Sequence, residues 1–203
     1  MIQIDPAKIS ERDNYKLLIG SIIPRPIAFV TSMSADGILN GAPFSYFNVV
    51  SSNPPLISVS VQRKDGMQKD TARNILAREE FVVHLVDEEN VSQINETAAS
   101  LSKDESEIAR AGLSPVESSV VSVPGVVESK VRMECVLEHA LELGGDASDV
   151  GCDLLIGRIV QFHIDQNIYD DGKIRPRKLA AVSRLAGHDY AKIGHIFTKK
   201  RPD

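Results

Sequence analysis

The chain of 203 residues contains no tryptophan, and only 5% of its residues are aromatic. A flat ligand would therefore have to rest on aliphatic side chains, on backbone or on one of the few Phe and Tyr residues. The two cysteines, Cys135 and Cys152, are too few for a disulfide framework. HxH and HExxH motifs and closely paired cysteines are also absent from the sequence, so we expect no metal site.

No apolar run approaches the roughly 18–20 residues that a membrane-spanning helix needs. The first residues, MIQIDPAKISERDNY, lack the basic start and apolar core of a secretion signal. A net charge of −5 and a pI near 5.6 argue against nucleic acid or an anionic membrane as the main partner. We therefore expect a cytoplasmic protein with no nucleic-acid or membrane partner, and the length fits one domain over residues 1–203.

Strand-like segments dominate the pattern of apolar residues. In the clearest one, Ile57, Val59 and Val61 alternate with serines, as in a half-buried strand. The pair Asp36-Gly37 is typical of a hairpin turn between two strands. The predicted strands cover residues 28–32, 40–50, 56–61, 81–86, 131–143 and 153–164. Six strands with short early connections favour an antiparallel barrel or sandwich.

Short helices are predicted as covers over these strands. Asp70 or Thr71 can cap a helix that ends at Arg78, because both residue types accept hydrogen bonds from first-turn N–H groups. Weaker helical patterns cover residues 11–18, 90–99 and 103–111. The segment after Asp165 is basic and predicted to be loop-like.

The strand over residues 40–50 carries Ser, Tyr and Asn where a buried strand is normally apolar, and Pro43 within it indicates a sheet edge or a bulge. An unpaired buried polar group costs roughly 1–3 kcal/mol, so such residues need partners. The pattern indicates a wall against a polar, flat ligand. For the segment that follows, Ser51-Ser52-Asn53, an ordinary polar turn without a ligand is the alternative.

Two further segments carry positive charge. Lys69-Asp70-Thr71 at a predicted helix start suits phosphate, because free N–H groups and the helix dipole attract an anion there. The alternative is a solvated lysine beside an ordinary helix cap. Arg25 lies between Pro24 and Pro26, which stiffen its backbone, so it either presents a fixed guanidinium to a ligand or is a surface residue.

The order of these segments resembles the flavin reductase-like family of FMN-binding split barrels, over about residues 14–190. The tail over residues 191–203 lies outside the resemblance. The matching segments are PRPIAFVTS, DGILNGAPFSYFNVVSSNPPLISVS, KDTARNI, EFVVHLV, EIARAGLSP, RMECVLE, IGRIVQFH and SRLAGHDY.

The resemblance implies a mainly β fold: a six-stranded antiparallel Greek-key split barrel with a few short covering helices. It also implies a homodimer with FMN in a groove near the subunit interface. By position, Lys69 and Thr71 would hold the phosphate, and Ser51 and Ser52 the ribityl chain or the phosphate. The implied cofactor-binding residues are Arg25, Pro26, Phe47, Asn48, Val49, Val50, Ser51, Ser52, Lys69, Thr71, Arg184 and Tyr190.

The function that the resemblance implies is an FMN-binding flavoprotein oxidoreductase that takes a hydride from NAD(P)H. Because the cofactor carries this chemistry, no catalytic acid–base residue is required, and we predict none. The first alternative is an FMN-bound electron carrier of the flavoredoxin type, serving a protein redox partner. The second is a barrel with no redox role. The basic residues 175–178 are interpreted as an exposed loop, with a patch for nicotinamide-cofactor phosphates as the alternative.

Overall fold

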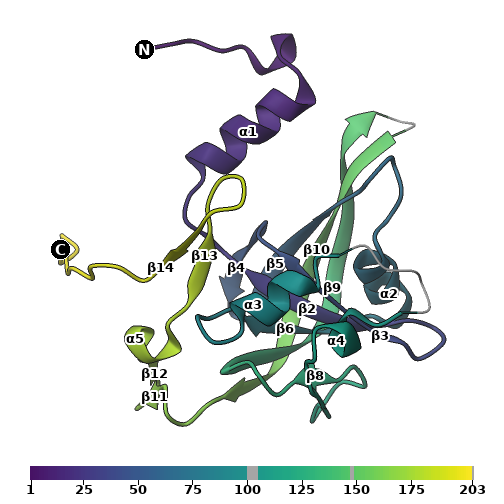
Figure 1. Ribbon diagram of the computed structural model, residues 1–203, viewed down its shortest axis with the longest axis vertical. Helices are drawn as coiled ribbons and strands as arrows, with labels where there is room; N and C mark the ends of the chain where they lie inside the picture. The colour runs from purple at the N-terminus through teal and green to yellow at the C-terminus, as the bar shows by residue number, and fades with distance from the viewer. Residues whose placement is uncertain (100–104, 147–148, 203) are drawn as a thin grey trace.

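Seven antiparallel strands form the main sheet of the computed structural model, which describes residues 1–99, 105–146 and 149–202 (Figure 1). The strands are β2 (Ala28–Met33), β3 (Leu39–Phe44), β4 (Phe47–Ser52), β5 (Pro55–Gln62), β6 (Glu80–Leu85), β9 (Val131–Asp146) and β10 (Asp149–Ile164). Their order across the sheet is β3-β2-β6-β9-β10-β5-β4. The predicted mainly β, antiparallel architecture is confirmed.

The sheet closes into a split barrel because its two edge strands, β3 and β4, follow each other in the chain. β3 pairs with β2, whereas β4 pairs with β5 at the other end of the strand order. Only Ser45 and Tyr46 join them, so the two edges come together at this corner. The single strand predicted over residues 40–50 is therefore two strands, which gives seven strands instead of six. Pro43 lies in edge strand β3, as its missing N–H requires.

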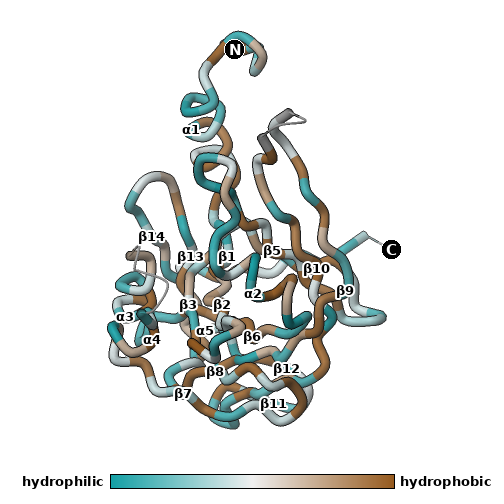
Figure 2. Tube along the Cα trace, turned by 90° about the vertical axis from the view of Figure 1, so that its right-hand side faces the viewer, coloured by the Kyte–Doolittle hydropathy of each residue, from teal (hydrophilic) through white to brown (hydrophobic). Residues whose placement is uncertain are grey.

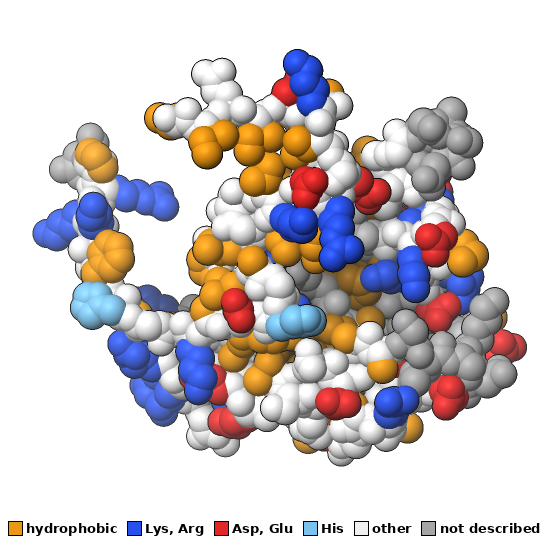
Figure 3. Space-filling model, turned by 45° about the horizontal axis from the view of Figure 1, so that its top comes forward, with side chains coloured by type: hydrophobic (Ala, Val, Ile, Leu, Met, Phe, Trp, Pro, Cys, Tyr) orange, Lys and Arg blue, Asp and Glu red, His pale blue; other side chains and the backbone are white. Residues whose placement is uncertain are grey.

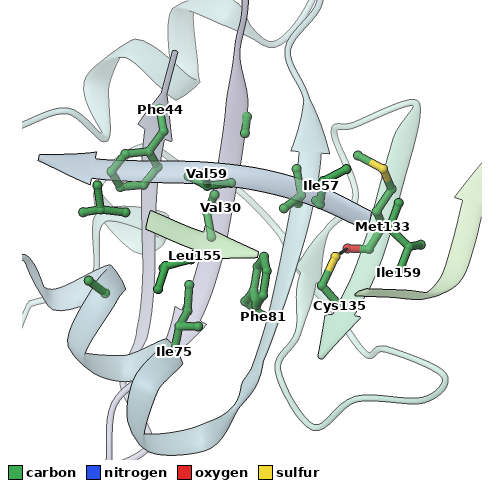
Figure 4. Close-up of a cluster of buried hydrophobic side chains, with 14 residues drawn as sticks. Val30, Phe44, Ile57, Val59, Ile75, Phe81, Met133, Cys135, Leu155 and Ile159 are labelled. Carbon is green, nitrogen blue, oxygen red and sulfur yellow. Dashed lines mark hydrogen bonds between the residues drawn. The ribbon is translucent and has the colours of Figure 1, made fainter. Parts of the chain in front are cut away.

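The inward faces of the strands enclose the main hydrophobic core (Figure 4). The alternation in β5 buries Ile57, Val59 and Val61, and a fully buried side chain of this size contributes about 1.5–3 kcal/mol. Phe81 of β6 is also fully buried. A Cβ atom at Gly157 of β10 would lie 2.3 Å from Cζ of Phe81, so the close packing of the Phe81 ring against the β10 backbone requires glycine.

Helices cover both faces of β2. Val30 packs in the main core with Ile75 of α2, whereas its neighbour Phe29 packs in a second cluster with Ile94 of α3 and Ile108 of α4. The helices are η1 (Pro6–Lys8, a 3-10 helix), α1 (Glu11–Ser21), α2 (Asp70–Arg78), α3 (Val91–Glu96), α4 (Glu107–Arg110) and α5 (Pro176–Leu179).

All four predicted helices exist, with ends that differ by a few residues. Residues 100–104, which include the start of the helix predicted over residues 103–111, lie outside the described residues. Among the described residues, none of the helices has the length and apolar character that crossing a membrane would require.

The segment after Asp165 is more ordered than predicted. Its elements are β11 (Tyr169–Asp170), β12 (Lys173–Ile174), α5, β13 (Val182–Arg184) and β14 (Tyr190–Lys192). β13 pairs with β1 (Arg25–Pro26) and with β14, and Figure 1 shows the turn between β13 and β14 beside α1. The loop prediction is wrong here because the pairing partner of β13 lies far away in the sequence. The basic residues 175–178 likewise fall in and before α5.

A buried carboxylate anchors the loop between β7 (Pro115–Val116) and β8 (Gly125–Val126). Glu134 of β9 accepts hydrogen bonds from the backbone N–H groups of Ser119, Val120 and Val121 at 2.6, 2.7 and 3.0 Å. His163 of β10 contacts the same carboxylate through Nε2. Burial raises the pKa of Glu134, but these hydrogen bonds outweigh that effect and lower the pKa to about 2.

Candidate functional site

A cavity of about 630 Å³ opens between the barrel, α1, α3 and the turn from β13 to β14. This volume is within the roughly 300–1,000 Å³ range of small-molecule pockets. Figure 3 shows basic and hydrophobic side chains side by side on this side of the molecule. The cavity is lined by Tyr15, Ile19, Arg25, Ile27, Pro43, Phe44, Ser45, Tyr46, Ser60, Gln62, Lys69, Asn95, Ala98, Arg184, Leu185, Gly187, His188 and Tyr190. Four predicted site residues are among them: Arg25, Lys69, Arg184 and Tyr190.

The start of α2 places a cation in the cavity wall. Lys69 is the N-cap residue, its side chain makes no capping hydrogen bond, and its ammonium lies 5.9 Å from the centre of the Phe44 ring. Burial lowers the pKa of Lys69, because the charged form loses hydration. Among the described residues, no carboxylate forms an ion pair with it. Since the positive end of the helix dipole adds to the ammonium, this end of the cavity suits a phosphate.

Thr71, the other predicted phosphate contact, uses its hydroxyl inside the protein. The side chain is buried, and Oγ1 donates to Oδ1 of Asn40 at 3.0 Å. Asn40 in turn donates from Nδ2 to the buried Glu107 carboxylate at 2.9 Å. Asp70 pairs with Arg73. The prediction that Asp70 or Thr71 caps α2 is therefore wrong, because both side chains have other partners. The backbone N–H groups of the first turn are then the donors that can face an anion.

Arg25 joins α1 to the turn between β13 and β14. Its guanidinium donates to the carbonyl oxygens of Ile19 at 2.7 Å, Ile22 at 2.6 Å and Leu185 at 2.8 Å. A cation at this position also complements the negative end of the α1 dipole. The Nε atom of Arg25 is buried and has no hydrogen-bond partner among the described residues. Pro26 is exposed and lies outside the cavity lining.

Arg184 and Tyr190 stack on each other in the wall opposite the barrel. The guanidinium carbon of Arg184 lies 4.5 Å from the centre of the Tyr190 ring, a cation–π arrangement. Arg184 also donates to the carbonyl oxygen of Gly187 at 2.6 Å, and the Tyr190 hydroxyl donates to Oδ1 of Asn95 at 2.9 Å. These contacts hold the turn at the edge of the cavity of the same chain.

The remaining predicted residues form a separate group on edge strand β4. Val49 and Val50 are 73% and 50% exposed. Oδ1 of Asn48 accepts a hydrogen bond from the N–H of Val49, and Oγ of Ser51 accepts one from the N–H of Asn53. None of the six residues from Phe47 to Ser52 lines the cavity of the single chain, so the structure does not bring them together with Lys69.

Several lining residues were missed in the sequence. Ser60 and Gln62 occupy the polar face of β5, and Nε2 of Gln62 donates to Oγ of Ser60 at 3.1 Å. The alternation of that strand was a usable signal. Tyr46 lies at the corner between β3 and β4, and burial raises its pKa. No local pattern marked Asn95 or His188, which reach the cavity only through the fold.

The two cysteines lie outside this cavity lining and are free thiols. Cys135 is in the barrel core, and burial raises the pKa of its thiol. Within the described ranges, no group of three or more His, Cys, Asp or Glu side chains is arranged to hold a metal ion. The cations and uncharged polar groups of the lining suit an organic ligand with an anionic end.

Comparison with known proteins agrees with this architecture. The family model described as "Flavin reductase like domain" matches residues 19–178. Nitrilotriacetate monooxygenase component B from Bacillus cereus is 59% identical over 98% of both chains, with a TM-score of 0.97. 2-Nitrobenzoate 2-nitroreductase NbaA from Pseudomonas fluorescens is 28% identical over 99% of this chain and 96% of that chain, with a TM-score of 0.89. Flavoredoxin of Desulfovibrio vulgaris (Miyazaki F) is 25% identical over 88% and 91% of the two chains, with a TM-score of 0.75.

The match covers most of the chain, and the protein therefore belongs to the flavin reductase-like family. The predicted family and the split-barrel fold are both confirmed.

Proposed function

We propose that the protein is a flavin-dependent oxidoreductase that binds FMN in the cavity and reduces it with NAD(P)H. Family membership supports a flavin as the ligand. The observation that carries the choice of FMN is the unpaired Lys69 ammonium at the start of α2, in the wall of an otherwise largely uncharged barrel face. The Lys69 ammonium and the start of α2 together suit a flavin with a single phosphate.

The lining residues fit the remaining parts of FMN. Ser45, Ser60 and Gln62 offer hydroxyl and amide groups of the kind that a ribityl chain needs. The buried Nε–H of Arg25 has no partner among the described residues, so it can donate a hydrogen bond to a carbonyl oxygen or ring nitrogen of the flavin. Figure 1 shows α2 and the β13–β14 pair on different sides of the barrel, so phosphate and ring would lie at different ends of the cavity.

FMN supplies the hydride-accepting chemistry at its N5 atom when it is bound, and the protein binds and orients it. Arg25 and Arg184 bring positive charge to the end of the cavity away from Lys69, where it favours an electron-rich ring. Tyr15 and Ile19 of α1 cover the cavity from outside the barrel and limit the access of water. This division of tasks needs no acid–base residue.

We also propose that the protein is a homodimer. Leu17 and Leu18 of α1 are 44% and 53% exposed, the residue that follows the helix, Ile22, is 60% exposed, and β4 exposes Val49 and Val50. Exposed hydrophobic side chains of this size are typical of interaction surfaces. Figure 2 shows the hydrophobic stretches on α1, which projects from the barrel. A second copy packed on β4 would bring residues 47–52 towards a cavity. Light scattering coupled to gel filtration tests this proposal, and a monomer at micromolar concentration contradicts it.

The alternative function is an FMN-bound electron carrier for a protein partner, which the similarity to flavoredoxin favours. The closer similarity to a monooxygenase component favours the reductase, whose reduced flavin would serve a separate oxygenase. Both functions need the same pocket. They differ in whether the flavin stays bound and whether a nicotinamide donor reduces it quickly.

The test is an absorbance spectrum of the purified protein, followed by anaerobic addition of NADH or NADPH with added FMN where the protein is colourless. We expect a flavin spectrum that bleaches promptly with one of the donors. Stable yellow colour without bleaching favours the carrier. A protein that takes up no FMN contradicts the proposal altogether.

A further inference from the structure

One face of α1 carries two cations next to two apolar residues. Arg12, Tyr15, Lys16 and Ile19 are spaced at i, i+3, i+4 and i+7, so they lie on the same side of the helix. Together with Ala186 and Gly187 they line a second cavity of about 410 Å³. Arg12 and Lys16 do not line the first cavity, so their charge is separate from that of Lys69, Arg25 and Arg184.

The two cavities adjoin each other, because Tyr15, Ile19 and Gly187 line both. Arg12 is seven residues before Ile19, which is about 10 Å along a helix. A ligand that begins at the flavin cavity and follows this face of α1 therefore passes Ile19 first, then Lys16 and Tyr15, and reaches Arg12 last. Figure 1 shows the turn between β13 and β14 directly beside α1, where this path begins.

Arg12 and Lys16 make few interactions with the rest of the described structure. Arg12 makes no hydrogen bond or ion pair with any residue that the structure describes. Nζ of Lys16 lies 2.9 Å from Oδ1 of Asp13, but both side chains are more than half exposed, and such pairs contribute little. Guanidinium and ammonium groups bind phosphate oxygens through charge-assisted hydrogen bonds. In a chain whose net charge is −5, a cationic cavity beside the candidate flavin site needs an explanation.

We propose that the second cavity binds the phosphate groups of the dinucleotide electron donor, with Arg12 and Lys16 as the recognising residues. This inference rests on the proposed function, because it assigns the donor's place beside the flavin. The nicotinamide would enter the shared part of the two cavities, and the phosphates would lie farther along α1. Leu17 and Leu18 occupy the other side of the helix, which leaves that side for a second copy of the chain.

The experiment compares the wild type with the double variant Arg12→Ala/Lys16→Ala. The control is Lys199→Ala/Lys200→Ala, which removes the same charge from exposed positions outside both cavities. Equilibrium binding of NAD⁺ and NADP⁺ is measured by calorimetry. Steady-state kinetics use NADH, NADPH and dihydronicotinamide riboside, a donor without phosphate.

We expect the double variant to bind the oxidised dinucleotides about tenfold more weakly, and the KM of the reduced ones to rise by about the same factor. We expect kcat, FMN retention and the rate with dihydronicotinamide riboside to be unchanged, and the control variant to behave as the wild type. A loss confined to NADP⁺ and NADPH assigns the cations to the 2′-phosphate. An equal loss for both donors assigns them to the diphosphate.

Unchanged dinucleotide affinity overturns the proposal. So does an equal fall in the rate with the riboside, because the cations would then act on the flavin cavity. A change from dimer to monomer in the double variant also overturns it, since this face would be a subunit contact. If no dihydronicotinamide reduces the wild type, the proposed function fails, and the calorimetric binding still decides whether the cations recognise the dinucleotide phosphates.

Discussion

Glu134 and Lys69 are charged groups in two regions of the same barrel, and their surroundings differ. The Glu134 carboxylate accepts three backbone hydrogen bonds from one loop and contacts His163, so its charge is satisfied within the fold. The Lys69 ammonium is partly desolvated, faces an aromatic ring, and has no anionic partner among the described residues. The charge of Glu134 stabilises the fold, whereas the charge of Lys69 lowers stability until an anion binds beside it.

This difference separates structural from functional residues more clearly than residue type does. The barrel and its loops satisfy their own polar groups, as the contacts of Asn40 with Thr71 and Glu107 also show. The cavity wall, in contrast, contains two groups without a partner among the described residues: the ammonium of Lys69, which has no anionic partner, and the Nε atom of Arg25, which makes no hydrogen bond. Variants of the two regions should therefore affect different measurements, and that expectation can be tested.

The largest effect is expected for Glu134→Gln, which replaces one acceptor oxygen with an amide that faces backbone N–H groups. We expect the free energy of unfolding to fall by about 3 kcal/mol, measured with urea, and FMN affinity to stay the same. The control is Glu138→Gln on the same strand, whose carboxylate pairs with the partly exposed Arg158 and should change stability by less than about 1 kcal/mol. Equal losses in the two variants would contradict the structural role of Glu134.

The same carboxylate predicts a dependence of stability on pH. Folding lowers the pKa of Glu134 from 4.5 to about 2, so the folded state binds fewer protons between these values. Its contribution is fully present above about pH 4.5 and is lost as the pH falls towards 2. Urea midpoints of the wild type should fall more steeply over this range than those of Glu134→Gln. Parallel curves would show that another group dominates acid unfolding.

In the cavity, Lys69→Ala should leave the unfolding free energy of the apoprotein unchanged or slightly higher, because a desolvated charge is removed. FMN affinity should fall by roughly 10- to 100-fold, the equivalent of one charge-assisted hydrogen bond. Riboflavin, which lacks the phosphate, should bind both proteins equally. Lys64→Ala removes an exposed lysine nearby and is the matched control. An equal loss of riboflavin affinity would place the phosphate elsewhere.

The strand pattern of the fold was predictable from the sequence because period-two alternation, as in Ile57, Val59 and Val61, reports burial directly. The corner at Ser45 and Tyr46 was not predictable, since both residues continue the strand pattern locally. Only the pairing of β3 and β4 with different neighbouring strands shows that the chain turns there. The β1–β13 pair was missed for the same reason: short strands distant in sequence leave no local signal.

The candidate site was predictable where charge and chain geometry coincide, as at Lys69 before a helix, and at Arg25, Arg184 and Tyr190 through the family resemblance. The site residues were not predictable where a side chain can form its hydrogen bond either with a ligand or with another residue of the protein. Thr71 satisfies its hydroxyl with Asn40, a residue that only the fold brings near. The residues of β4 stay predictions, because the cavity of one chain does not include them.

The smallest effect is expected at the far wall of the cavity, for Tyr190→Phe. This change removes the hydrogen bond to Asn95 but keeps the ring beneath Arg184. A neutral hydrogen bond at a partly exposed site contributes about 0.5–1 kcal/mol, so FMN affinity should fall only by about two- to fivefold.

Tyr190→Ala also removes the cation–π contact and releases Arg184 from its stacked position, so its effect on FMN affinity should be larger than that of Tyr190→Phe. Neither variant should change the affinities for riboflavin and FMN by different factors, because in the proposed arrangement the wall formed by Arg184 and Tyr190 faces the flavin ring. The variants at the two ends of the cavity should therefore differ. Replacing Lys69 removes the preference for FMN over riboflavin, whereas replacing Tyr190 keeps that preference. If FMN affinity is unchanged in both Tyr190 variants, this wall does not contact the flavin, and the ring end of the site must be assigned to β4 and a second copy of the chain.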